Sequence, residues 1–221
     1  MKKILLIMMV AMLCAATANA QIKFGVKAGL NLSSLSDIKV EGSGASLSLL
    51  ESDGMVAGFH VGGFVNFSFG QYIGLQPELL FSMQGGKQKL NQQIYDVSAV
   101  SDLTLDYINI PILVDIKPFA NFSVLVGPQI GFNIYKSVTS DGETISGSDF
   151  DKSLEEEFGK NPFKSLDFAA VIALQYTFIE HLTVGARYNI GLTNAFSISE
   201  SGASAKGWKN NVLQLSVGWT F

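Results

Sequence analysis

The sequence has few charged residues and no excess of basic ones. Charged side chains make up 15% of the 221 residues, and the formal net charge is −4 at pH 7. Soluble domains contain about 25% charged residues, so this composition excludes a disordered or strongly solvated chain. A nucleic-acid binder needs a basic face that contacts phosphates, and this composition does not supply one. We therefore expect no nucleic acid among the partners.

The chain also lacks a long apolar run and has a single cysteine. After residue 20 no stretch reaches the ~18 consecutive apolar residues of a transmembrane helix, which excludes a helical membrane protein. The cysteine, Cys14, lies in the N-terminal segment, so residues 21–221 contain none. This part of the chain is expected to fold by burial and hydrogen bonding, without disulfides.

The first twenty residues have the pattern of a secretory signal peptide. Lys2 and Lys3 precede an apolar core at residues 4–13, which is too short to span a bilayer. Ala18 and Ala20 form an A-x-A cleavage site, so the mature chain is expected to begin at Gln21. The sequence therefore divides into a signal peptide, residues 1–20, and one exported domain, residues 21–221.

Alternation of apolar and polar or small residues is the main signal in that domain. Apolar side chains recur at every second position, as they do from Ile22 through Phe24 and Val26 to Leu32. A period of two predicts β-strands. Segments of about 10–13 residues are long enough to cross a bilayer as tilted strands. There are eight such segments: 22–32, 57–67, 73–83, 107–116, 122–133, 167–178, 182–193 and 212–221.

The predicted connections alternate between short and long. Short turns are expected at 70–71, 118–121 and 179–181, and long loops at about 34–55, 85–102, 136–165 and 195–210. This pattern predicts an all-β fold, an eight-stranded antiparallel up-and-down transmembrane β-barrel in an outer membrane. Both mature termini would then lie on the short-turn, periplasmic side, and the long loops would be extracellular.

The two faces of the predicted strands differ in size and charge. One face carries bulky apolar residues, which would overfill the bore of an eight-stranded barrel and are therefore expected to face lipid. The other is rich in glycine and carries ionisable residues. Because an unpaired buried charge is costly, Lys27, Glu78 and Arg187 are expected to pair across the bore. The predicted structural polar network of the interior comprises Lys27, His60, Glu78, Asp115 and Arg187.

The opposite orientation defines an alternative. In a soluble lipocalin-like carrier the apolar face points inward, and Phe59, Val61, Ile110 and Leu215 would face the central axis. The direction of these four side chains therefore decides between a membrane barrel and a carrier.

Several segments resemble the PorT-type family of outer-membrane β-barrel proteins, which is related in architecture to the OmpA/OmpX-like small barrels. The resemblance implies an eight-stranded barrel without shared catalytic residues, and one branch is linked to type IX protein secretion. The terminal Phe221, with Trp219 on the same face, resembles the signal read by the outer-membrane assembly machinery. The segments are GVKAGLNLSSL (Gly25–Leu35), GFHVGGFVNF (Gly58–Phe67), LQPELLFSMQGGK (Leu75–Lys87), DYINIPILVDIKP (Asp106–Pro118), VGPQIGFNI (Val126–Ile134), ARYNIGLTN (Ala186–Asn194) and VLQLSVGWTF (Val212–Phe221).

Candidate catalytic and metal sites are weak. A barrel enzyme acting on lipid would need a nucleophile beside a histidine, and His60 with Ser82 on the next strand is the best pair available. No metal-ligand spacing such as H-x-x-x-H or C-x-x-C occurs. The acidic residues at 141–157 are interpreted as a solvated loop, with contact to divalent cations that bridge lipopolysaccharide as the alternative. We therefore expect no enzymatic activity, no cofactor and no metal.

The leading hypothesis is a non-enzymatic integral outer-membrane barrel whose outward loops serve surface interaction or envelope integrity. Its expected partners are outer-membrane lipid and lipopolysaccharide, the assembly machinery and other envelope proteins. The alternatives are a component of a protein-secretion machinery, the soluble carrier and the lipid enzyme.

Overall fold

The protein is described from a computed structural model, which covers residues 21–42, 45–90, 100–140, 143–147, 149, 152, 164–200 and 203–221. Antiparallel β-strands account for nearly all of these residues. Within these ranges no helix has the length and apolar character needed to cross a membrane.

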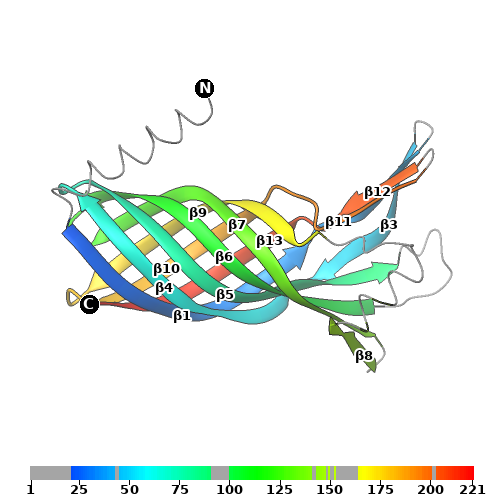
Figure 1. Cartoon of the computed structure of the whole chain (residues 1–221), viewed down its shortest axis with the longest axis horizontal. Coiled ribbons are helices and arrows are strands. Elements are labelled where there is room, and N and C mark those ends of the chain that lie inside the picture. Colours follow the sequence, from blue (N-terminus) through cyan, green and yellow to red (C-terminus); the bar gives the residue numbers. More distant parts are fainter. Residues whose placement is uncertain are drawn as a thin grey trace.

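Eight long strands form a closed barrel (Figure 1). Each strand is hydrogen-bonded to two neighbours in the order β4-β1-β13-β10-β9-β7-β6-β5, and β5 pairs with β4 to complete the ring. The predicted eight-stranded antiparallel barrel is therefore confirmed. The strands are β1 (Gln21–Leu35), β4 (Val56–Phe69), β5 (Ile73–Leu90), β6 (Val100–Phe119), β7 (Phe122–Ser140), β9 (Leu166–Phe178), β10 (Leu182–Gly191) and β13 (Asn210–Thr220).

The first and last barrel strands close the ring. β1 and β13 pair antiparallel from Gly25↔Thr220 to Leu35↔Asn210. The Phe221 backbone N–H then donates to the Phe24 carbonyl at 2.8 Å. A closed ring leaves none of its strands with an unpaired edge, which hydrocarbon does not tolerate.

The bulky apolar face points outward. Phe59 and Val61 are each 47% exposed and Leu215 is 55% exposed, while Ile110 is half-exposed. Lys27 on the opposite parity is only 4% exposed. An apolar exterior around a charged interior is the arrangement that lipid requires, and it rules out the soluble carrier.

The two ends of the barrel differ. Residues 70–72, 120–121 and 179–181 form short turns at one end, which we call the short-turn mouth; Gln21 and Phe221 lie there too. The opposite end continues into further strands (Figure 1). β5, β6 and β7 are 18, 20 and 19 residues long, well beyond the ~9–11 residues that cross a bilayer.

Strands also form where the sequence predicted only loops. The hairpins β2 (Ile38–Gly42)–β3 (Ala45–Gly54) and β11 (Phe196–Glu200)–β12 (Ala203–Gly207) pair through β12 and β2 into a four-stranded sheet attached to β5 by β3. β8 (Glu143–Ser146) adds to β7. The predicted loop limits were therefore wrong. The physical reason is that β12 and β2, far apart in sequence, supply each other's backbone partners.

Candidate functional site

The five ionisable residues predicted for the interior come from five different strands. All are buried, none more than 6% exposed. The structure does not gather them at one point; it distributes them over three levels along the bore. They are Lys27 (β1), His60 (β4), Glu78 (β5), Asp115 (β6) and Arg187 (β10).

The central level is an ion cluster around Glu78. Lys27 Nζ donates to Glu78 Oε1 at 2.7 Å, and Arg187 Nη2 lies 2.7 Å from both carboxylate oxygens. The side chain of Glu78 is fully buried, that of Lys27 is 3% exposed, and that of Arg187 is 6% exposed. Phe64 packs beside Lys27, with its ring centroid 5.4 Å from Nζ. These side chains fill the bore at this level, so solvent does not reach the carboxylate.

The second level lies between the central level and the end of the barrel that continues into further strands, and it is built around His60 and Asn31. His60 Nδ1 lies 2.7 Å from Asn31 Oδ1, which also accepts from Gln214 Nε2 at 2.9 Å. Asn31 Nδ2 donates to Ser82 Oγ at 3.0 Å. His60 and Ser82 are thus neighbours joined through an amide, and both are buried. This is a satisfied polar network, and a lipid substrate has no access to it.

The third level lies near the short-turn mouth and contains Asp115. Its Oδ2 accepts from Asn66 Nδ2 at 2.8 Å and lies 3.3 Å from Lys117 Nζ. Lys117 also donates to Ser68 Oγ at 2.7 Å. Asp115 is therefore neutralised locally rather than by the central cluster.

Neutral amides on β5 also belong to the interior network, and the sequence reasoning missed them. Gln76 Nε2 donates to Glu78 Oε1 at 2.8 Å, and Gln76 Oε1 accepts from Asn66 Nδ2 at 3.0 Å. On the other side Gln84 Nε2 donates to Ser82 Oγ at 2.7 Å. The signal was present, because Gln76, Glu78, Ser82 and Gln84 share one parity of one strand. The prediction considered ionisable residues alone and therefore omitted these neutral polar side chains.

One wall of the interior is apolar. Leu113, Leu125, Val171 and Ala173 form a buried cluster on β6, β7 and β9. These residues lie on the parity that the sequence assigned to polar and small residues. These side chains lie beside the ion cluster, since Ala173 is the register partner of Arg187, and they line the rest of the bore with hydrocarbon.

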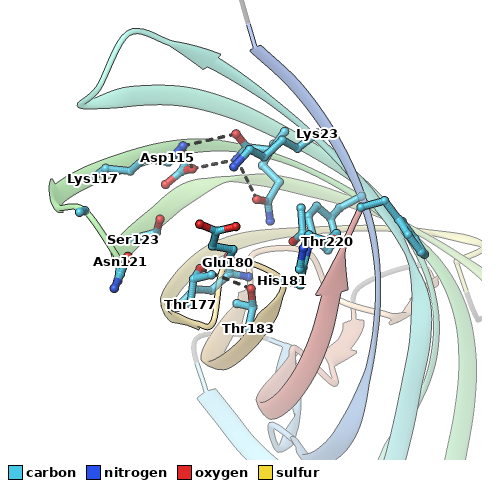
Figure 2. Close-up of a pocket in the computed structure, with 16 residues that line it drawn as sticks. Lys23, Asp115, Lys117, Asn121, Ser123, Thr177, Glu180, His181, Thr183 and Thr220 are labelled. Carbon is cyan, nitrogen blue, oxygen red and sulfur yellow. Dashed lines mark hydrogen bonds and ion pairs between the residues drawn. The ribbon is translucent and has the colours of Figure 1, made fainter.

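A cavity of about 480 Å³ opens at the short-turn mouth (Figure 2). Asn66, Asp115 and Lys117 line one side, and Ser123, Thr177 and Thr183 line the other. Phe64 and Gln76, which contact the central cluster, also line it. The cavity therefore occupies the end of the bore on the short-turn side of the ion cluster.

The remaining predicted site residues lie at or beyond this mouth. Trp219 is 47% exposed on the outer face and stacks on His181, with ring centroids 5.4 Å apart. Phe221 is 71% exposed. Gln21 begins β1, whereas Ala18 and Ala20 lie outside the described residues. Most of the acidic segment 141–157 also lies outside them, and the described residues contain no cluster of His, Cys, Asp or Glu that could hold a metal ion.

Comparison with known proteins assigns the family. A family profile described as outer membrane protein beta-barrel domain matches residues 16–197, which is most of the chain. The chain belongs to this outer-membrane β-barrel family. Membership agrees with the closed barrel and its apolar exterior, and it makes this protein an integral outer-membrane barrel. No curated protein matches the chain.

Solved structures similar to this chain include a Neisserial surface protein, an outer membrane protein and an attachment invasion locus protein. Neisserial surface protein A is 14% identical, with 89% of this chain and 95% of that chain covered and a TM-score of 0.45. OprG from Pseudomonas aeruginosa is 11% identical, with coverage of 90% and 95% and a TM-score of 0.45. Ail of Yersinia pestis is 13% identical, with coverage of 90% and 98% and a TM-score of 0.40.

Proposed function

We propose that this protein is a non-enzymatic outer-membrane anchor that holds a β-sheet outside the membrane for contact with other molecules. The observation that carries this proposal is the contrast between the two parts of the structure. The barrel is filled by the Glu78 ion cluster and by apolar side chains, whereas four strands from two separate hairpins pair beyond it.

The filled bore argues against transport. A solute would have to displace Lys27, Glu78 and Arg187. The Lys27 Nζ and Arg187 Nη2 atoms each lie 2.7 Å from Glu78 Oε1. Separating such buried ions from one another costs several kcal/mol for each ion. The buried His60–Asn31–Ser82 network likewise argues against catalysis, because substrate cannot approach it.

The projecting sheet has an edge suited to binding. β11 pairs with β12 on one side, and no described strand pairs with its other side. A free strand edge presents backbone N–H and C=O groups to an extended segment of a partner, and such pairing supplies affinity with little demand on sequence. An envelope or surface protein is therefore the proposed partner class.

The proposed orientation follows from the two unlike ends. The short turns and both ends of residues 21–221 face the periplasm, and the β2–β3 and β11–β12 hairpins face outward among lipopolysaccharide. Residues 1–20 serve as the cleaved signal peptide with Ala18 and Ala20 at the cleavage site. Trp219 and Phe221 at the closing strand are the proposed contact for the assembly machinery.

The orientation is tested by cysteine labelling on intact cells, because residues 21–221 contain no cysteine. Two exposed isoleucines mark the opposite ends of the barrel. Ile145 lies on β8 and is 50% exposed, and Ile179 lies in a short turn and is 87% exposed. We expect a membrane-impermeant maleimide to label Ile145→Cys and to leave Ile179→Cys unlabelled until the cells are lysed. The reverse pattern would overturn the proposed orientation.

The partner class is tested by a photo-crosslinking residue at Ile198 on β11, with Ile179 as the matched position at the opposite end. We expect adducts to an envelope or surface protein from Ile198 alone. Adducts to secretion components from either position would select the PorT-type role, which rests on the sequence segments. Equal adduct patterns at both positions would contradict a dedicated binding edge.

A further inference from the structure

The cavity at the short-turn mouth has the size of a small-molecule site. Its volume of about 480 Å³ lies within the ~300–1,000 Å³ range of ligand pockets. Its walls come from the rims of the strands and from the turn at Glu180 and His181, which Figure 2 shows facing Asp115 and Lys117 across the cavity.

The charged side chains that line this cavity balance in number. Lys117 is paired with Asp115 at 3.3 Å, and the remaining ionised side chains of the lining, Lys23 and Glu180, have opposite signs. His181 Nδ1 lies 2.8 Å from the Thr220 carbonyl. An anionic ligand therefore finds no surplus of cationic side chains. The remaining polar lining is made of amides and hydroxyls, which both donate and accept, and includes Asn66, Gln76, Ser123, Gln175, Thr177 and Thr183.

One buried acceptor in this lining is unsatisfied. Asp115 is 1% exposed, and its Oδ1 accepts no hydrogen bond from any described residue, although Oδ2 has both Asn66 and Lys117. A buried carboxylate oxygen without a donor is costly, so a ligand donor that reaches it from the cavity after a small rotation of the Asp115 side chain stabilises it. Figure 2 shows this carboxylate at the cavity wall. A ligand hydroxyl is the neutral group that fits it.

The cavity also presents an apolar surface. Phe64 lines it, and the ring is fixed on one side by Lys27 and by Gly25, where a Cβ would lie 2.2 Å from the ring. A fixed aromatic ring with surrounding amides and hydroxyls complements a molecule that has both C–H faces and hydroxyl edges.

We propose that the short-turn mouth binds a neutral, hydroxyl-rich ligand of one or two sugar rings, with Asp115 Oδ1 accepting a ligand hydroxyl. The ligand comes either from free sugar or from the end of a glycan chain, since both present the same ring chemistry. This site is separate from the outward sheet, so the failure of one proposal leaves the other intact.

The test uses the full folded protein in a detergent without a sugar headgroup, because an alkyl glycoside would itself compete. Binding of maltose, of N,N′-diacetylchitobiose and of a long soluble chitin oligomer is followed by NMR shift changes of backbone amides. We expect saturable shifts confined to the mouth. Binding of the disaccharides alone assigns free sugar as the source, and equal binding of the long oligomer assigns a glycan end.

Variants locate the site. Asp115→Asn presents an amide donor where the acceptor was, and we expect affinity to fall at least about tenfold, which corresponds to about 1.4 kcal/mol. Asp167→Asn, at the opposite end and bonded to Thr193, is the matched control and should bind normally. Ser123→Ala, which removes one hydroxyl from the wall and disturbs no ion pair, should weaken binding several-fold.

Three results would overturn the proposal. The first is the absence of saturable shifts with every probe. The second is unchanged binding in both Asp115→Asn and Ser123→Ala. The third is tighter binding of glucuronate than of the neutral sugars, because a preference for an anion contradicts the balanced lining.

Discussion

At the scale of single residues, the ion cluster holds the interior together through one anion and two cations. Glu78 is the shared counter-ion of Lys27 and Arg187, so its loss has a different consequence from the loss of either cation. Removing one partner of a buried pair leaves an uncompensated charge, and the penalty exceeds that of removing a surplus charge.

We therefore expect Glu78→Gln to destabilise the folded barrel by about 3–5 kcal/mol, because two buried cations lose their counter-ion. Lys27→Met should cost distinctly less, since it leaves Arg187 and Glu78 as a balanced pair. Urea unfolding in lipid vesicles, followed by the gel shift between folded and unfolded forms, gives both values. Equal losses in the two variants would show that charge balance does not set stability here.

Ile179 is a second residue with a clear energetic consequence. It has a φ of 44° and precedes Glu180 at 56°, although a β-branched side chain disfavours this left-handed region. Ile179 is 87% exposed, so replacing it removes little packing. Ile179→Asn should raise stability by roughly 1 kcal/mol, because asparagine tolerates this conformation. Ile179→Val, which keeps the branched Cβ, is the control and should show no gain in urea unfolding.

At the scale of elements, the barrel strands were predictable and the projecting sheet was not. The eight transmembrane segments alternate over ten or more residues with bulky side chains on one face, and this signal survives without tertiary information. β2, β11 and β12 are only five residues long, and the sheet depends on two hairpins more than 140 residues apart in sequence meeting at Ala203↔Gly42. No local pattern encodes that meeting.

The interior was predictable in part. The alternation along the strands placed Lys27, Glu78 and Arg187 inward. The free-energy cost of an unpaired buried charge predicted that they pair. The contacts themselves depend on barrel register, which joins residues 51 and 109 positions apart. The same alternation correctly places Leu113 and Leu125 inward, although that face was predicted to be small and polar, because an inward position in a small barrel accepts any side chain that fills space.

The hairpin β11–β12 lies outside the closed ring, so the barrel should not require it. Replacing residues 197–206 with a short Gly-Ser linker should leave the heat-dependent gel shift intact and abolish cross-linking to the partner. Because the replacement removes Ile198, the cross-links are measured from a second probe at Ser46 on β3. Loss of the folded form in this variant would show that the sheet contributes to barrel stability, contrary to expectation.

At the scale of the whole molecule, the apolar exterior requires a bilayer. Leu215 lies in the middle of β13 and is 55% exposed, whereas Ile22 lies near the short-turn end of β1 and is 47% exposed. Leu215→Arg should destabilise the barrel by about 2–4 kcal/mol, and Ile22→Arg by no more than about 1 kcal/mol, because the cost depends on depth. Urea unfolding in vesicles measures both, and an equal cost would contradict the assigned membrane position.

The pairing of β12 with β2 ties the architecture of two surface hairpins to each other. Inserting one residue into either strand would turn every following side chain to the other face of the sheet and break the match from Ala203↔Gly42 to Lys206↔Lys39. Natural variants, and peptides grafted for display, should therefore change length in steps of two residues or in both hairpins together. The two hairpins would evolve as a single unit, although one lies near the N-terminus of the chain and the other near its C-terminus.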